Sequence, residues 1–324
     1  MRRCDDGGGE VRVSMRARVA CVVAVATGLG LAGCSGGDEA GPVDIPAAVP
    51  PVTSINQALQ LPLAKYALPA TDVATIYNGA AVMTNACLAR FGVPPAMQPT
   101  ARRGPSDLIY VLGHLPNPLS QEVAQSYGLR GEPKPQEALG GSDDDTVVTR
   151  ELTAREKEIL SGFKGGRQGD GEEPSTLKDK DGNRVPEEGC SREGFDKLGT
   201  GFTELTNLVM DGSNNSWNRM KDHPRYQEAV SAWQGCMKAK GYDVSDPFTF
   251  AEQFEGKPEA TRRKAALDDG ACLDKTNLPG ISYAIDKANQ QQFIDDHAAQ
   301  FTSAWDGAQK MLTTARAAIA KGQP

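Results

Sequence analysis

The clearest pattern in the chain is a helical periodicity between Thr71 and Gly92. Apolar residues recur there at spacings of three and four, which places them on one face of an amphipathic helix. They are Val73, Ile76, Tyr77, Ala80, Met83, Cys87 and Phe91. Thr71 and Asp72 are suited to cap the first turn, and Gly92 to end the last. The pattern therefore predicts a helix over residues 71–92.

A longer pattern of the same kind fills the C-terminal end of the chain. Apolar residues follow a heptad seam at Ala298, Phe301, Trp305, Ala308, Leu312, Ala315 and Ile319. With Ile281, Ala284 and Ala288 ahead of this seam, the pattern predicts one helix of about 40 residues starting at Pro279. The alanines of the seam favour close packing against another helix of the same domain.

Further helical patterns cover residues 152–162, residues 226–240 with Cys236 on the apolar face, and residues 257–277 with Cys272. Residues 106–115, "SDLIYVLGHL", fit either a short strand or a buried turn. Only 6% of the residues are aromatic, so the core depends on small aliphatic side chains, which suit helices better than a β-sandwich. We expect an all-α fold, an irregular helical bundle with a long C-terminal helix, stapled by two disulfides.

Two polar segments interrupt these patterns. Residues 34–60 mix Gly, Pro, Ser and Asp with isolated apolar residues, a composition typical of a flexible tether. Residues 162–189 are dense in Gly, Lys, Asp and Glu, and a loop of this length predicts a mobile excursion. The expected organisation is a tether followed by one helical domain over residues 61–321.

The N-terminal residues have the pattern of a secretory signal peptide. Arg16 and Arg18 follow Met15, and residues 19–32 form an apolar run of 14 residues. A membrane-spanning helix needs about 20 apolar residues, so this run is too short to span a bilayer. A charged start, a short apolar core and small residues at the exit predict a signal peptide over residues 1–33. Residues 1–14 precede the second methionine and look like an overcalled start.

The exit of that segment, Leu31-Ala32-Gly33-Cys34, resembles the lipobox of bacterial lipoproteins. The resemblance implies cleavage after Gly33 and acylation of Cys34 with a thioether-linked diacylglycerol, palmitate being the typical acyl group. It also implies a lipid anchor in the outer face of the cytoplasmic membrane, held by several acyl chains at about 0.8 kcal/mol per buried methylene. The alternative is an ordinary cysteine in a discarded signal peptide.

The net charge limits the partners of the mature chain. Residues 1–33 hold five of the 35 Lys and Arg and three of the 42 Asp and Glu, so the remainder carries 30 basic and 39 acidic residues, a formal charge of −9. An acidic chain with no basic cluster argues against nucleic acid as a partner. Contact with the membrane is expected through the lipid anchor, not through an electrostatic interaction with anionic lipids.

Four cysteines remain in the mature chain besides Cys34: Cys87, Cys190, Cys236 and Cys272. An even number in an exported chain predicts two disulfides. Their spacing lacks a CxxC pair or a nearby histidine, so we expect no metal site. Four cysteines allow three pairings, and we slightly favour Cys87–Cys190 with Cys236–Cys272, because the second pair is close in sequence.

Two short motifs resemble functional sites and fail on their details. "DKDGN" at Asp179 matches the first ligands of an EF-hand, but Arg184 replaces the required glycine and Cys190 the bidentate glutamate. "SGFK" at Ser161, "SNN" at Ser213 and "KTN" at Lys275 echo the elements of penicillin-binding enzymes. Ser161 ends a predicted helix where the nucleophile should begin one. We therefore expect no catalytic residue and no cofactor.

The remaining candidates are histidines and tryptophans. His114, His223 and His297 are far apart in sequence and lack a GxSxG or HExxH frame, which argues against a hydrolase or metalloprotease site. Trp217 lies among polar neighbours in "DGSNNSWNRM" and is the best candidate for an exposed binding aromatic. The other two tryptophans have the helical spacing of core residues.

Three segments together resemble a family of secreted lipoproteins from actinobacteria that has no assigned activity. They are "LPLAKY" at 61–66, "WQGCMKAKGY" at 233–242 and "ACLDKTNL" at 271–278. The resemblance implies a lipidated, surface-exposed and mostly helical protein. Its motifs describe disulfide and packing positions, so it transfers no catalytic residue.

These observations predict a non-enzymatic lipoprotein of the cell envelope and leave two kinds of partner open. The first is another envelope protein, which would need an exposed apolar or aromatic patch. The second is a small molecule or cell-wall fragment, delivered in some cases to a transporter, which would need a concave pocket with convergent polar groups. An acyl-transfer enzyme is a third and weaker hypothesis.

Overall fold

A computed structural model describes residues 41–98, 111, 114–116, 118–133, 150–166 and 172–322, all within one compact unit, Gly41–Pro324. The prediction of an all-α fold is confirmed: these residues form helices, and their β pairing is limited to isolated bridges, among them Phe163 with Pro174 and Lys178 with Arg184. The expected signal peptide and Cys34 lie outside the described residues. No described helix is long and apolar enough to cross a membrane.

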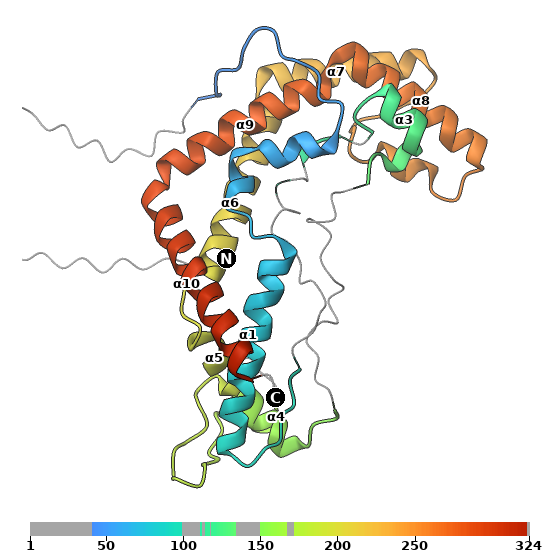
Figure 1. The fold of residues 1–324 in the computed structure, drawn as a ribbon. Helices are drawn as coiled ribbons and strands as arrows, with labels where there is room; N and C mark the ends of the chain where they lie inside the picture. Colours follow the sequence, from blue (N-terminus) through green and yellow to red (C-terminus); the bar gives the residue numbers. More distant parts are fainter. Residues whose placement is uncertain are drawn as a thin grey trace, which may run out of the picture. The chain divides into compact units, whose positions relative to one another are not determined.

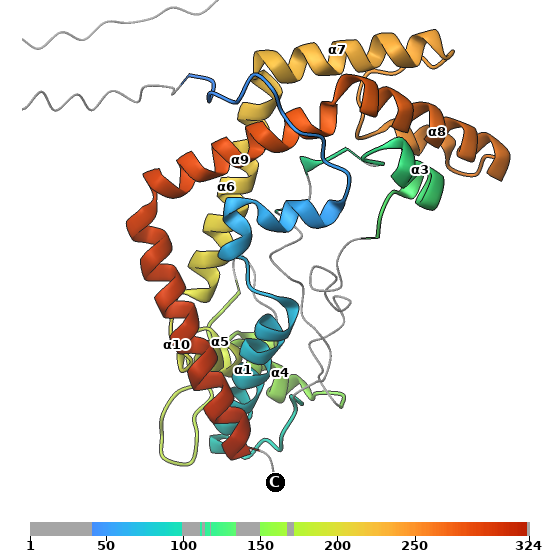
Figure 2. The same cartoon turned by 45° about the horizontal axis from the view of Figure 1, so that its top comes forward.

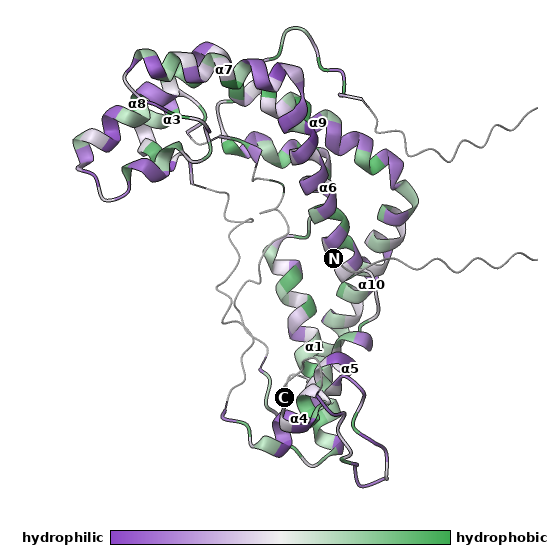
Figure 3. Cartoon of the chain, turned by 180° about the vertical axis from the view of Figure 1, so that it is seen from behind, coloured by the Kyte–Doolittle hydropathy of each residue, from purple (hydrophilic) through white to green (hydrophobic). Residues whose placement is uncertain are grey.

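The largest hydrophobic cluster is built by α1 (Ala70–Arg90), α6 (Phe202–Asp222) and α10 (Ala298–Gly322). Helices α1 and α10 lie side by side (Figure 1), and most residues along α1 are hydrophobic (Figure 3). Gly79 of α1 faces Ala315 of α10 so closely that a Cβ added to Gly79 would meet the Ala315 Cβ at 2.5 Å. The small residues of the heptad seam therefore allow the close helix packing that we expected.

A second cluster joins α7 (Pro224–Ala239), α8 (Glu259–Thr276) and α9 (Leu278–Asp296). Trp233 lies at its centre, completely buried. Short helices α3 (Gln121–Tyr127) and η4 (Gly128–Arg130) pack against α8. The Cys236–Cys272 disulfide, with a Cα–Cα distance of 5.7 Å, links α7 to α8.

A third cluster surrounds α4 (Ala154–Ser161) and α5 (Gly189–Asp196). The Cys87–Cys190 disulfide, with a Cα–Cα distance of 5.5 Å, links α1 to α5. Both cysteines are completely buried. The structure therefore contains the two disulfides favoured from the sequence, each inside a separate hydrophobic cluster.

The prediction of a single helix from Pro279 is wrong in one respect. The helical segment is divided at His297 into α9 and α10. The backbone there leaves the helical region, with φ −117° and ψ 21°. The His297 ring stacks on Phe293 at 4.1 Å, and its Nδ1 lies 2.8 Å from the Phe293 carbonyl oxygen. The chain turns sharply between the two helices (Figures 1 and 2).

The expected tether over residues 34–60 also needs correction. From Gly41 onward the segment packs on the domain and ends in the 3-10 helix η1 (Ile55–Gln60), which is followed by a second, η2 (Pro62–Lys65). Arg225 donates hydrogen bonds to the carbonyl oxygens of Pro46 and Ala47. Val52, Ile55 and Ala58 are buried in the largest cluster. Isolated apolar residues in a Pro-rich segment therefore belong to the core, and at most residues 34–40 of the expected tether remain outside the described domain.

The loop over residues 162–189 makes defined contacts on both sides of its undescribed part, residues 167–171. Phe163 pairs with Pro174, and Lys178 with Arg184, in isolated bridges. The Ser175 hydroxyl donates to Glu158 on α4 at 2.7 Å. Val185 is buried in the third cluster and Leu177 packs against it, so residues of the loop contribute to that core.

Candidate functional site

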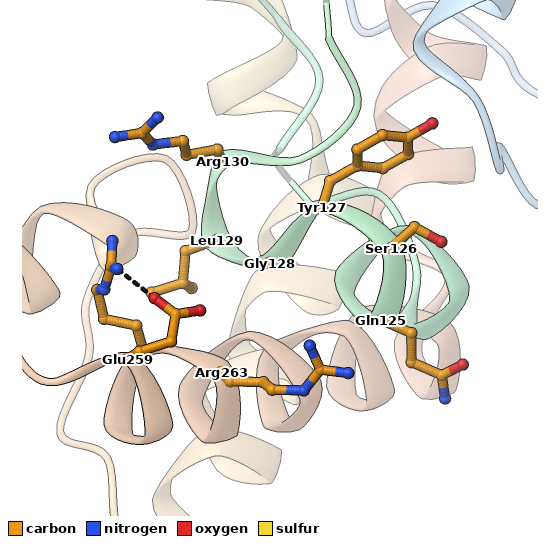
Figure 4. A pocket seen from close by; sticks show the side chains of 9 residues that line it. Gln125, Ser126, Tyr127, Gly128, Leu129, Arg130, Glu259 and Arg263 are labelled. Atoms are coloured by element: carbon orange, nitrogen blue, oxygen red, sulfur yellow. Dashed lines mark hydrogen bonds and ion pairs between the residues drawn. The ribbon is translucent and has the colours of Figure 1, made fainter.

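A concave pocket of about 360 Å³ lies where α3 and η4 meet the first turns of α8 (Figure 4). Its lining combines polar and cationic side chains from two separate parts of the sequence. The lining residues are Gln125, Ser126, Tyr127, Gly128, Leu129, Arg130, Glu259, Arg262 and Arg263. We call this surface the arginine pocket.

Local sequence fixes the two walls of the arginine pocket. The Ser120 hydroxyl caps α3 by accepting a hydrogen bond from the Val123 amide. Gly128, at φ +67°, ends α3 in a conformation that favours glycine. The Gln121 amide donates to Asp274 of α8 at 3.0 Å, and Gly270 lets the backbones approach, because a Cβ there would meet the Gln121 Cα at 2.7 Å. The walls are therefore held at a fixed separation.

The arginine pocket concentrates positive charge in an otherwise acidic chain. Three of its lining residues are arginines, and the single carboxylate, Glu259, pairs with Arg262. The Arg262 Nε is buried without a hydrogen-bond partner, and Arg263 makes no ion pair with any residue that the structure describes. Both arginines lie in the first two turns of α8, where the helix dipole adds partial positive charge.

This arrangement is suited to binding an anion. Guanidinium groups present paired N–H donors that match carboxylate and phosphate oxygens. In Figure 4, the Arg263 side chain extends along α8 towards Gln125. The Arg262 guanidinium bonds Glu259. Tyr127, 49% exposed, adds an accessible aromatic ring beside these donors. The described lining offers recognition groups and no histidine to activate a nucleophile.

A second polar cluster lies buried between α6 and α9. His114 Nε2 is 3.3 Å from the Ser213 hydroxyl, and His114 Nδ1 is 3.6 Å from Asp286 Oδ1. Asp286 also accepts hydrogen bonds from Ser216 and from Gln290. The fold therefore brings together a serine, a histidine and an aspartate that are far apart in the sequence.

The order of these groups matches a catalytic triad, but their environment does not. Ser213 is 3% exposed and Asp286 is 1% exposed, so a substrate has no route to the hydroxyl through the described residues. The 3.6 Å separation of His114 and Asp286 exceeds hydrogen-bond distance. Gln290 in turn accepts from the Leu63 amide at 3.1 Å. The cluster links four segments and has the character of a structural network.

The expectation that Trp217 is an exposed aromatic is wrong. Its ring stacks on His114 with 5.2 Å between ring centroids and contacts Phe248 edge-on at 4.8 Å. Trp217 is half-buried, because the polar neighbours in its sequence lie on other faces of α6. Helical spacing, and not local polarity, decides its environment.

The motifs rejected from sequence lie in separate places. Ser161 ends α4, as expected, and its hydroxyl accepts from the Phe163 amide; Ser213 lies in α6 and Lys275 in α8. Asp179 accepts from the Asn183 side chain and from the Asp181 and Asn183 amides, and these bonds lower its pKa although burial opposes them. The described residues contain no group of three or more potential metal ligands.

Sequence reasoning missed the arginine pocket. Arg130 and the Arg262–Arg263 pair are separated by more than a hundred residues, so no local pattern relates them. The chain matches no protein-family model, no curated protein and no solved structure. The geometry and chemistry of the pocket therefore carry the functional argument.

Proposed function

We propose that the chain is a non-enzymatic lipoprotein, anchored through Cys34 at the outer face of the cytoplasmic membrane, that binds a small anionic ligand in the arginine pocket. The anchor is supported by the signal-peptide pattern of residues 1–33 and by the lipobox. The ligand class is supported by three arginines in one concave surface of an acidic protein.

Of the two kinds of partner expected from the sequence, this geometry favours the small molecule. Tyr77 and Tyr127, the exposed large hydrophobic side chains among the described residues, lie on different helices, α1 and α3. They do not form the contiguous apolar patch that a protein partner would need. The arginine pocket has the concave shape and the convergent polar groups of a ligand site.

The observation that carries the proposal is the unpaired Arg263 beside Arg262 in this pocket. Arg263 has no counter-ion among the described residues, and an anion bound against it would neutralise its charge. Carboxylates and phosphates fit equally well, since both present paired oxygens. The ligand is therefore defined by its anionic group.

Calorimetry on the acylated protein in detergent tests the proposal, with pyrophosphate and citrate as phosphate and carboxylate probes. We expect binding that weakens with added salt and falls at least tenfold in Arg263→Gln. Arg184→Gln is the matched control, because Arg184 is an exposed arginine on a distant loop. Equal affinity in both variants, or no binding of either probe to the wild type, would refute the arginine pocket.

The anchor has its own test. Mass spectrometry of the protein from its host should show a diacylglyceryl group on Cys34 as the first residue. Cys34→Ala should leave the membrane fraction. Recovery of an unmodified Cys34 would remove the anchoring part of the proposal and leave the ligand site intact.

A further inference from the structure

An apolar groove of about 450 Å³ runs between residues 44–52 and α9. One wall is formed by Ile45, Pro46, Val49 and Pro50, and the other by Tyr283, Ala284 and Ala288. Lys287, an exposed residue of α9, stands at the rim. Asp44, Gln57 and Gln291 complete the lining, so the groove is mainly apolar with Lys287 and a few other polar side chains.

The proline-rich wall is fixed to the domain. Arg225 binds the carbonyl oxygens of Pro46 and Ala47, and Asn277 Nδ2 donates to the Val49 carbonyl at 2.8 Å. His223 Nε2 lies 3.0 Å from the Val43 carbonyl oxygen. Because these carbonyl groups are held by the domain, the groove is a permanent feature of the fold.

The chemistry of this wall favours a hydrocarbon occupant over a peptide. Pro46, Pro50 and Pro51 have no N–H group, and the carbonyls of Pro46, Ala47 and Val49 are already bonded. A peptide strand adding to this wall would find few backbone partners. A saturated chain needs none and would bury apolar surface on both sides.

Sequence distance places the groove near the proposed anchor. Nine residues lie between Cys34 and Asp44 at the groove, so the groove lies within about 35 Å of the acylated residue even with that segment fully extended. This step rests on the lipid anchor of the proposed function. A domain anchored through so short a segment keeps the groove within reach of the bilayer surface.

We propose that the groove binds one acyl chain of a membrane phospholipid. The acyl chain lies between Tyr283 and the proline-rich wall, and Lys287 at the rim faces the phosphate of the headgroup. Amphipathic lysine side chains serve this purpose at membrane surfaces, since the stem contacts apolar groups while the ammonium stays hydrated.

The test places a tryptophan in the groove with Tyr283→Trp, in the acylated protein reconstituted into vesicles of phosphatidylcholine and phosphatidylglycerol. Vesicles with brominated acyl chains quench a tryptophan that contacts those chains. We expect quenching of Y283W well above that of the wild type, whose own tryptophans provide the background. Arg184→Trp is the reporter control, because Arg184 is exposed on a distant loop, and it should give only the background value.

A charged residue in the groove gives the second arm. Adding Ala288→Glu to Y283W should abolish the extra quenching, while adding Ala299→Glu, at an exposed alanine of α10, should preserve it. Circular dichroism of each variant reports whether the helical fold is retained. Quenching of Y283W at the background level, or unchanged by A288E, would overturn the proposal.

Two further outcomes separate this inference from the proposed function. If Cys34 carries its lipid but Y283W is not quenched, the groove proposal fails while the anchor stands. If the Y283W emission is already blue-shifted in detergent without phospholipid, and the shift is lost in Cys34→Ala, the chain of Cys34 itself fills the groove. That result would overturn the assignment to a membrane phospholipid.

Discussion

The indole Nε1 of Trp233 donates a hydrogen bond to Asp269 Oδ1 at 2.8 Å, and both side chains are buried. No cation pairs with this carboxylate among the described residues. Burial raises the pKa of Asp269 to about 7, and the hydrogen bond from Trp233 offsets only part of that rise. The carboxyl therefore changes its charge near neutral pH inside the second hydrophobic cluster.

This raised pKa predicts a stability that falls with pH. Between about pH 4 and pH 7 the folded state holds a proton that the unfolded state has lost, so the free energy of unfolding decreases as the pH rises. Asp269→Asn keeps an acceptor for Trp233 and removes the titration. We expect the difference in free energy of unfolding between D269N and the wild type to shift in favour of D269N by about 3 kcal/mol from pH 5 to pH 8. Urea unfolding at each pH measures this difference.

Asp268→Asn is the control for that measurement. Burial opposes ionisation of Asp268, but Lys264, Lys240 and Tyr242 donate hydrogen bonds to its carboxylate and lower its pKa. Loss of this carboxylate should therefore destabilise the protein at pH 8, opposite in sign to D269N. A pH-independent difference between D269N and the wild type would contradict the assignment.

The contact between Gly79 and Ala315 predicts that replacing Gly79 by alanine destabilises the protein, although alanine is the better helix former. A Cβ at Gly79 would lie 2.5 Å from the Ala315 Cβ, and overpacking of this kind costs about 1–3 kcal/mol. Gly79→Ala should lower the midpoint of urea unfolding. Gly235→Ala in α7, where an added Cβ meets no atom within 4 Å, should raise stability by up to about 1 kcal/mol. Stabilisation by both changes would disprove the close packing.

The two disulfides should contribute unequally to stability. Cys87–Cys190 spans a separation of 103 residues and Cys236–Cys272 one of 36, and the chain-entropy model assigns about 4.7 kcal/mol to a loop of about 100 residues and less to a shorter one. The double variant C87A/C190A should therefore unfold at lower urea than C236A/C272A. Thiol alkylation followed by mass spectrometry should find all four cysteines oxidised in the wild type.

Because the buried cluster around Asp286 is structural, substitutions in it should lower the stability of the fold, and Ser213 should not react as a catalytic serine. Asp286→Ala removes the side-chain acceptor of the Gln290 amide, at about 1–3 kcal/mol, and leaves the Ser216 hydroxyl only the residue 286 backbone carbonyl at 3.3 Å. Asp286→Asn keeps one acceptor oxygen and should cost less. A fluorophosphonate probe should not label Ser213 in the wild type; specific labelling that is lost in Ser213→Ala would establish a catalytic serine.

Helical periodicity was sufficient to locate helices that have one continuous apolar face. The predicted helix at 71–92 corresponds to α1, although Pro69 caps it and Asp72 lies within the first turn. The position of Cys236 on an apolar face also agrees with its disulfide. Periodicity could not indicate the break at His297, since the heptad pattern continues on both sides and the stacking on Phe293 is a local contact.

The candidate sites were not predictable for a different reason. The arginine pocket depends on α3 lying against α8, and the apolar groove on residues 44–52 lying against α9. Both arrangements are set by tertiary contacts such as Gly270 against Gln121. Composition was also a poor guide to residues 41–60, because a few well-placed residues such as Ile55 suffice to fix a proline-rich segment to the core.

The Cys87–Cys190 bond has a consequence for how the chain withstands proteolysis. Every peptide bond between these cysteines lies inside a closed covalent ring, which contains the long Gly-rich and acidic stretches of the sequence. A protease that cuts this ring once produces two fragments that stay joined through sulfur. The C-terminal fragment, with the α8 wall of the arginine pocket, then remains attached to the N-terminal fragment.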